Sequence, residues 1–111
     1  MAARPALHRT GDAGEALADS DRRAAHVSDV LKAVAHPLRV RIVATLCRGE
    51  EHVSGLAEKL GVPQAIVSQQ LRILRLHDLV AVTRVNGFAR YRLAERQLRS
   101  LVSCMERCEE H

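Results

Sequence analysis

Aromatic residues are almost absent from this chain of 111 residues, which has one phenylalanine, one tyrosine and no tryptophan. Proteins that bind RNA or single-stranded DNA commonly stack bases on aromatic rings, so this composition argues against such partners. The chain also lacks an apolar run long enough to span a membrane and an apolar signal-peptide core near its N-terminus. We therefore expect a cytoplasmic protein whose three cysteines are thiols.

The motifs of common enzymes are missing as well. The sequence has no glycine-rich phosphate loop, no His-Glu-x-x-His zinc motif and no credible Ser/His/Asp set. A thiol oxidoreductase would need Cys-x-x-Cys beside a βαβ unit, and neither is found. The length suits one domain with a single small core, and a net charge of +4 favours an anionic partner. We expect a binding protein and not an enzyme.

Two short helices joined by a tight turn are predicted in the middle of the chain. The first covers residues 54–60, with Ser54 as its N-cap, and Gly61 ends it. The turn Gly61-Val62-Pro63 has the length that a helix-turn-helix uses. The second helix is expected from about Pro63 to about Leu76. Its buried face is predicted from helical spacing to hold Val67, Leu71 and Leu74.

The opposite face of this second helix carries small, amide and cationic side chains, which reach base edges and phosphates in a major groove. We predict base contacts by four of them, namely Gln64, Ala65, Ser68 and Gln69. Phosphate contacts are predicted for Arg72 and Arg75. A protein-docking helix would instead favour exposed aromatic or leucine side chains. This pattern therefore predicts a recognition helix for double-stranded DNA.

A basic β-hairpin is predicted directly after the recognition helix. Residues 79–83 and 88–93 are the strands, and Asn86-Gly87 is a strong signal for a tight turn between them. A two-residue turn places Val80 opposite Leu93 and Val82 opposite Tyr91 on one buried face. Arg84 and Arg90 would then lie on a wing beside the DNA. Taken alone, these arginines are better explained as the solvated face of a hairpin, but that explanation does not account for the adjoining helix-turn-helix, and together the two elements indicate a winged helix.

The remaining segments complete a mainly α fold with a small β-hairpin, in the order α-α-α-α-β-β-α. Further helices are expected at residues 21–35, 37–47 and 95–109, each with apolar residues at helical spacing. Residues 1–20 lack such periodicity and are predicted to form a mobile N-terminal tail. Residues 21–111 would form one winged helix-turn-helix domain.

Three stretches carry a family resemblance: residues 31–39 (LKAVAHPLR), residues 67–71 (VSQQL) and residues 87–93 (GFARYRL). In these, the chain resembles the ArsR/SmtB family of bacterial winged-helix repressors, which sense metals, metalloids or thiol-reactive species. The resemblance implies a homodimer packed through its first and last helices. Such a dimer would read a pseudo-palindromic operator with half-sites about 34–36 Å apart or a multiple of this, and an effector would release it.

The resemblance also suggests where an effector ion could bind. The family's Cys-x-Cys site falls on His52 and Ser54, so that site is absent here. The family's ligand positions on the last helix fall on Glu95, Gln97, Cys108 and His111. Cys104 and Cys108 are four positions apart and His111 follows three later, so we expect all three on one face of the last helix, with Glu95 or a second subunit completing the site. Two thiolates would favour a soft ion such as Zn, Cd, Cu(I) or As(III).

Two alternatives to this metal site remain open at the level of the sequence. Cys47 could form a disulfide or polysulfide bridge with Cys104 or Cys108 when thiols are oxidised or sulfide is present. Family members that work in this way have their cysteine nearer to the position of Ala44. Alternatively, the cysteines of the last helix pack as small apolar residues at a dimer seam, and the chain is a constitutive DNA-binding dimer.

Overall fold

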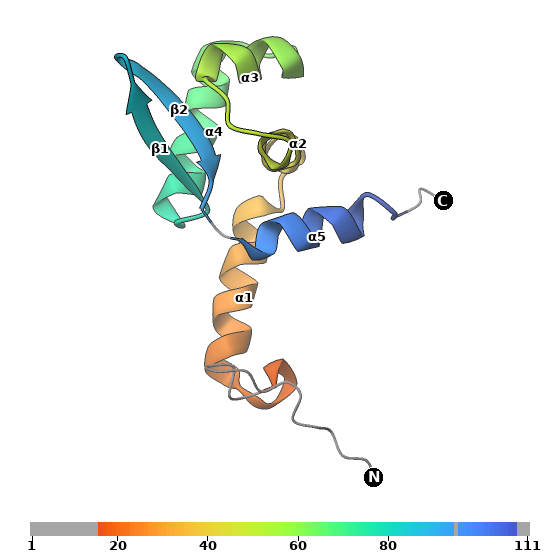
Figure 1. Cartoon of the computed structure of the whole chain (residues 1–111). Coiled ribbons are helices and arrows are strands. Elements are labelled where there is room, and N and C mark those ends of the chain that lie inside the picture. Colours follow the sequence, from red (N-terminus) through yellow and green to blue (C-terminus); the bar gives the residue numbers. More distant parts are fainter. Residues whose placement is uncertain (1–15, 95, 109–111) are drawn as a thin grey trace. The chain divides into compact units, whose positions relative to one another are not determined.

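The computed structural model describes residues 16–94 and 96–108. The chain divides into two compact units, residues 1–31 and 32–111, and each is described by itself. Among the described residues, no helix is long and apolar enough to cross a membrane. The predicted order of four helices, a hairpin and a last helix is confirmed (Figure 1), after a short 3-10 helix, η3: η3 Leu17–Asp19, α1 Asp21–Val34, α2 Pro37–Cys47, α3 Val53–Leu60, α4 Gln64–Leu76, β1 Val80–Val85, β2 Phe88–Leu93 and α5 Gln97–Met105.

The first unit contains the beginning of α1. The Ser20 hydroxyl is buried and accepts a hydrogen bond from the backbone N–H of Arg23 at 3.1 Å, which satisfies one of the donors at the start of the helix. η3 directly precedes this cap. Most of the predicted tail, residues 1–15, lies outside the described residues, so its mobility stays a prediction.

The core of the second unit lies around α2, which packs against α3, α4, α5 and β2. Figure 1 shows α2 end-on, between α3 and α5. The predicted apolar faces of the helices supply the core, because their side chains recur at helical spacing. The largest fully buried side chains are Ile42, Leu46, Leu56, Val67, Leu71, Leu74, Leu79 and Leu98.

Arg39 of α2 fixes the position of α4 by hydrogen bonds from its guanidinium. Its Nε donates to Oε1 of Gln70 at 2.8 Å, and its Nη1 donates to the carbonyl oxygen of Ala33 at 2.7 Å. The side chain therefore links the start of α2 both to the middle of α4 and to the end of α1. As predicted, Pro37 opens α2. The ring of His36, in the N-cap position, accepts a hydrogen bond from the backbone N–H of Leu38.

The predicted helix-turn-helix is confirmed. Gly61 ends α3 in the left-handed conformation (φ 71°, ψ 33°), which glycine adopts without a steric cost. The predicted N-cap at Ser54 is wrong, because α3 begins at Val53 with His52 in the N-cap position. The reason is a long-range bridge: the backbone N–H and C=O of Glu51 pair with Tyr91 of β2 at 3.0 and 2.8 Å. The extended chain ends there and the helix follows at once.

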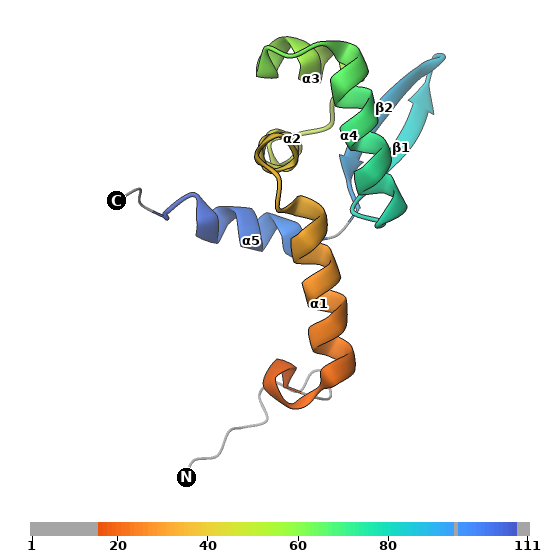
Figure 2. The same ribbon diagram turned by 180° about the vertical axis from the view of Figure 1, so that it is seen from behind.

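The hairpin has the register that the sequence predicts, with Val80 opposite Leu93 and Val82 opposite Tyr91. Asn86 (φ 52°) and Gly87 (φ 84°) are both left-handed, as a two-residue turn of the primed type requires. β1 packs against α4 (Figure 2), so the hairpin is held directly against this helix.

The last helix is shorter than predicted, because α5 ends at Met105 and not near residue 109. Its final turn tightens, since the N–H groups of Arg107 and Cys108 donate to carbonyls three residues earlier. The described residues after Met105 are all polar or small and exposed, so no apolar face remains to hold a further turn against α2.

Candidate functional site

The two faces of α4 differ as the sequence predicts. Val67, Leu71 and Leu74 are at most 1% exposed and hold the helix against the core. The opposite face is open to solvent at every predicted DNA-contacting position of α4, which are Gln64, Ala65, Ser68, Gln69, Arg72 and Arg75. No ion pair between described residues involves an arginine of α4. The helix therefore presents amide and hydroxyl groups together with cations that no described residue pairs with in an ion pair, which suits it to a polyanion.

The hairpin carries Arg84 and Arg90, the two arginines of this element that the sequence predicts to meet DNA. Arg84 is exposed, and the side chain of Arg90 is 43% exposed with its Nη1 4.0 Å from Oε1 of Glu50. Neighbouring residues of a strand point to opposite faces, so the register places Arg84 and Arg90 on opposite faces of the hairpin. An ion pair at this distance between exposed groups contributes little and does not prevent Arg90 from pairing with a phosphate.

A strap of two residues, Glu51 and His52, fastens the wing to the start of α3. The Nδ1 atom of His52 lies 3.0 Å from the carbonyl oxygen of Ala89 in β2. The carboxylate of Glu51 accepts the backbone N–H of His52 at 3.0 Å and lies 2.7 Å from Nζ of Lys59. Gly55 leaves the space for this carboxylate, which a Cβ atom there would enter. Sequence reasoning missed the strap, although a glycine inside a predicted helix is a signal of such a close approach.

Replacing Lys59 by methionine should raise the pKa of Glu51. The hydrogen bond from Lys59 and then that from the His52 N–H hold this pKa below its ordinary value. Glu51 therefore stabilises the fold above the ordinary carboxylate pKa, and this stabilisation is lost as the pH falls through the lowered value. We expect Lys59→Met to lose less stability than the wild type between about pH 7 and about pH 3, measured by urea unfolding. An unchanged Glu51 titration by NMR in Lys59→Met, with Lys59→Arg as control, would contradict the assignment.

The three cysteines are free thiols in different surroundings. Cys104 and Cys108 are exposed, whereas Cys47 is half-buried. Burial raises the pKa of the Cys47 thiol, while the guanidinium of Arg99 opposes this rise and the carboxylate of Glu106 adds to it. The predicted last helix does not reach Cys108, which lies in the turn that follows α5, so a joint role of Cys104 and Cys108 stays a prediction.

The predicted metal ligands are only partly described. Glu95 and His111 lie outside the described residues, as does the side chain of Gln97. Within the described part of the chain, no three histidine, cysteine or acidic side chains are grouped closely enough to hold a metal ion. The donors that are described, the exposed thiols of Cys104 and Cys108, have the chemistry of a soft-ion site.

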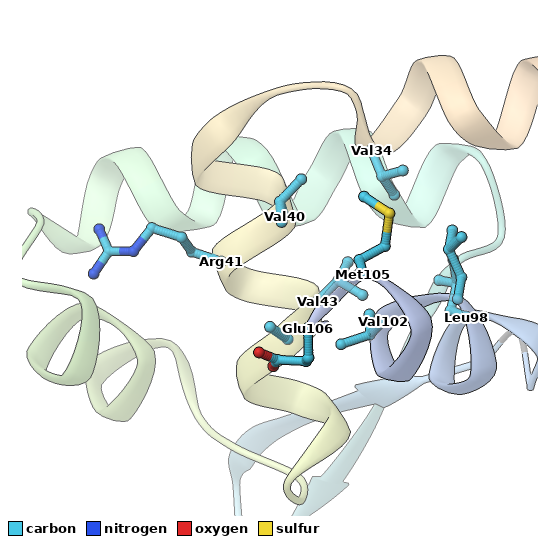
Figure 3. A pocket seen from close by; sticks show the side chains of 10 residues that line it. Val34, Val40, Arg41, Val43, Leu98, Val102, Met105 and Glu106 are labelled. Carbon is cyan, nitrogen blue, oxygen red and sulfur yellow. The ribbon is translucent and has the colours of Figure 1, made fainter. Parts of the chain in front are cut away.

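An apolar groove of about 200 Å³ lies between α2 and α5. Figure 3 shows side chains of both helices turned toward one another, with Arg41 extending away from them. At one end of α2, Nη1 of Arg99 donates to the carbonyl oxygen of Cys47 at 2.6 Å, which ties α5 to α2. The groove is lined by Val34, Val40, Arg41, Val43, Ala44, Leu98, Leu101, Val102, Met105 and Glu106.

Comparison with known proteins agrees with this geometry. Residues 36–82 match the family model described as "Bacterial regulatory protein, arsR family". The chain is 37% identical over 87 residues to the biofilm growth-associated repressor of Xylella fastidiosa, covering 78% of this chain and 76% of that protein. The crystal structure of the transcriptional repressor BigR from Xylella fastidiosa has a TM-score of 0.77 and 34% identity, covering 86% of this chain and 100% of that one. The solution structure of a homodimeric winged helix-turn-helix DNA-binding domain from Mycobacterium bovis has a TM-score of 0.67 and 28% identity. The match covers 89% of this chain and 99% of that one. The chain belongs to the ArsR/SmtB family of bacterial winged-helix transcriptional repressors.

Proposed function

We propose that this repressor acts as a homodimer that places α4 of each protomer in the major groove of a pseudo-palindromic operator. The observation that carries the proposal is the division of α4 into a fully buried apolar face and an exposed face of amide, hydroxyl and cationic groups. Gln64, Ala65, Ser68 and Gln69 would contact base edges, because they lie on the first two turns of the helix. The phosphate contacts would come from Arg72, Arg75, Arg84 and Arg90.

Two observations support the homodimer. The groove-lining side chains of α5 are incompletely covered: Met105 is 52% exposed, and Leu101 and Val102 are half-buried. Exposed apolar side chains of this kind commonly mark an interface. The Mycobacterium bovis domain of the same fold is homodimeric. Two protomers related by a two-fold axis would present two α4 helices to half-sites one helical turn, or a multiple of one turn, apart.

For the effector we propose a thiophilic metal or metalloid ion that binds Cys104 and Cys108, with Glu95 and His111 as further ligands. Both thiols are exposed and separated by about one turn of chain, so an arriving ion can reach them without unfolding the core. Thiolates select soft ions such as Cd(II), Cu(I), As(III) and Zn(II). Metal binding displaces the thiol protons, so the affinity should rise with pH.

The alternative effector is an oxidant that links Cys47 to Cys104 or Cys108 in a disulfide, or sulfide together with an oxidant, which would place one sulfide-derived sulfur between the two cysteines. In that second case the two thiols and the sulfide lose four protons and four electrons to the oxidant. In the disulfide case, two thiols lose two protons and two electrons to the oxidant. The thiolate is the reactive form, and burial raises the pKa of Cys47, so the exposed thiols would react first. The hydrogen bond from Arg99 to the backbone of Cys47 favours this route in one respect, because it brings α5 to the end of α2 that carries Cys47.

Either effector would act on α4 through α2. Arg99 joins α5 to the end of α2, and Arg39 joins the start of α2 to Gln70 in the middle of α4. A movement of α5 would therefore shift α2 and, with it, the angle of the recognition helix. A coupling of about 1–3 kcal/mol, or about 5–150-fold in affinity, is usual for such switches.

The test is fluorescence anisotropy with DNA from the promoter that precedes the protein's own gene. Reduced protein is titrated with and without Zn(II), Cd(II), Cu(I) or arsenite, and then after peroxide alone or peroxide with sulfide. We expect one of the ions to release the DNA from the wild type and from Cys47→Ser, but not from Cys104→Ser or Cys108→Ser. Release only after peroxide, with or without sulfide, and lost in Cys47→Ser, would favour the thiol switch. Release by neither would contradict both effectors and leave a constitutive DNA-binding dimer.

A further inference from the structure

Phe88, the only phenylalanine of the chain, lies at the tip of the wing and is 67% exposed. It directly follows the turn Asn86-Gly87 and lies opposite Val85, which is itself 39% exposed. The tip of the hairpin is therefore apolar on one face. An exposed large apolar side chain is common on its own, but here it stands at the outermost point of an element that is expected to meet DNA.

The position of this ring is fixed by the strap described above. The ring of His52 packs edge-on against Phe88, with the ring centroids 6.0 Å apart and an interplanar angle of 65°. The same histidine lies 3.0 Å from the carbonyl oxygen of the next residue, Ala89. A tight turn with two left-handed residues closes the hairpin on the other side. These contacts hold the exposed ring in place before any DNA is bound. Its binding would therefore cost little further conformational entropy.

Cations flank the apolar tip. Arg90 lies two residues along β2 and so shares the face of Phe88, whereas Arg84 lies on the other face. The hairpin, residues 80–93, contains no acidic residue. An apolar point between two cations is complementary to the minor groove, which is about 6 Å wide and has phosphates on both edges. Proteins that use this groove frequently insert apolar side chains there.

We propose that Phe88 enters the minor groove next to the half-site read by α4 and packs against sugars and base edges. Arg84 and Arg90 would bind the phosphates on the two sides of this groove. This inference rests on the proposed DNA binding. Because a ring contact releases no counterions, its contribution to affinity should not depend on salt, whereas the contribution of an arginine should.

The experiment measures operator affinity by anisotropy across a series of salt concentrations. We expect Phe88→Ala to bind about 10-fold more weakly at every salt concentration, with the slope of log Kd against log salt unchanged. Phe88→Leu should fall between this variant and the wild type. Arg84→Ala should lower the slope by about 0.9 for each phosphate that the arginine neutralises in the wild type. Leu76→Ala, which removes a 77% exposed leucine from the end of α4, is the matched control and should bind as the wild type does.

Two results would overturn the inference. One is wild-type affinity in Phe88→Ala, and the other is a loss of affinity that comes with a lowered salt slope, as in Arg84→Ala. Urea unfolding of Phe88→Ala shows whether its loss of affinity comes from a weakened fold. If it does, the affinity and salt slope of Phe88→Leu decide whether the ring contacts DNA. Failure of the wild type itself to bind any DNA selectively would refute the proposed function. Normal binding by both the wild type and Phe88→Ala would refute only the role of Phe88.

Discussion

Arg72→Glu should weaken operator binding by about 100-fold or more at about 0.1 M salt, because two arginine–phosphate interactions of roughly 1.4 kcal/mol or more each are removed from a dimer. The side chain lies on the exposed face of α4 and has no ion-pair partner among the described residues. A glutamate there would also repel the phosphates. The free energy of unfolding should change by less than about 0.5 kcal/mol, because the residue is outside the core. Anisotropy and urea unfolding measure the two quantities.

The matched control for this variant is Arg48→Glu. Arg48 is an exposed arginine that follows α2, so its reversal changes the net charge by the same amount at a site outside α4 and the hairpin. A purely global charge effect would weaken both variants equally. Equal losses in Arg72→Glu and Arg48→Glu would contradict the assignment of α4 as the DNA-binding surface.

Leu71→Ala should destabilise the fold by about 2–5 kcal/mol, which is the usual cost of removing a buried leucine side chain from a core. Leu71 is 1% exposed and lies on the face of α4 opposite to the recognition face. Urea unfolding at neutral pH measures the change through the shift in midpoint. Under conditions where the variant remains folded, its preference among operator sequences should match that of the wild type.

Gln69→Ala is the complementary change on the same helix. Its side chain is exposed, so the free energy of unfolding should change by less than about 0.5 kcal/mol. The loss should instead be in the free energy of DNA binding, about 1–3 kcal/mol at particular base pairs and none at others. If Leu71→Ala altered base preference while Gln69→Ala altered only stability, the two faces of α4 would have been assigned the wrong way round.

The features predicted correctly from the sequence are those that local signals determine. The period of Val67, Leu71 and Leu74 places one face of α4 in the core, because no other orientation buries all three. The turn Asn86-Gly87 fixes the hairpin register, since a two-residue turn allows one pairing of the flanking strands.

The features that the sequence did not predict depend on contacts between distant residues. The start of α3 at Val53 follows from the bridge between Glu51 and Tyr91, forty positions apart, which no local capping signal reveals. The end of α5 at Met105 depends on where packing against α2 stops. The prediction that one helix carries both Cys104 and Cys108 was therefore wrong, since it assumed that the helix continued.

The most direct test of the account is selection of bound sequences from a random double-stranded DNA library by the wild type and by two variants. We predict a pseudo-palindromic motif with half-sites about 10–10.5 base pairs, or a multiple of this, from centre to centre. Gln69→Ala should change the preferred base at defined positions of each half-site. Arg72→Ala should lower the yield and leave the motif the same. No enriched motif, or one that Gln69→Ala leaves unchanged, would contradict the central claim that α4 reads the operator.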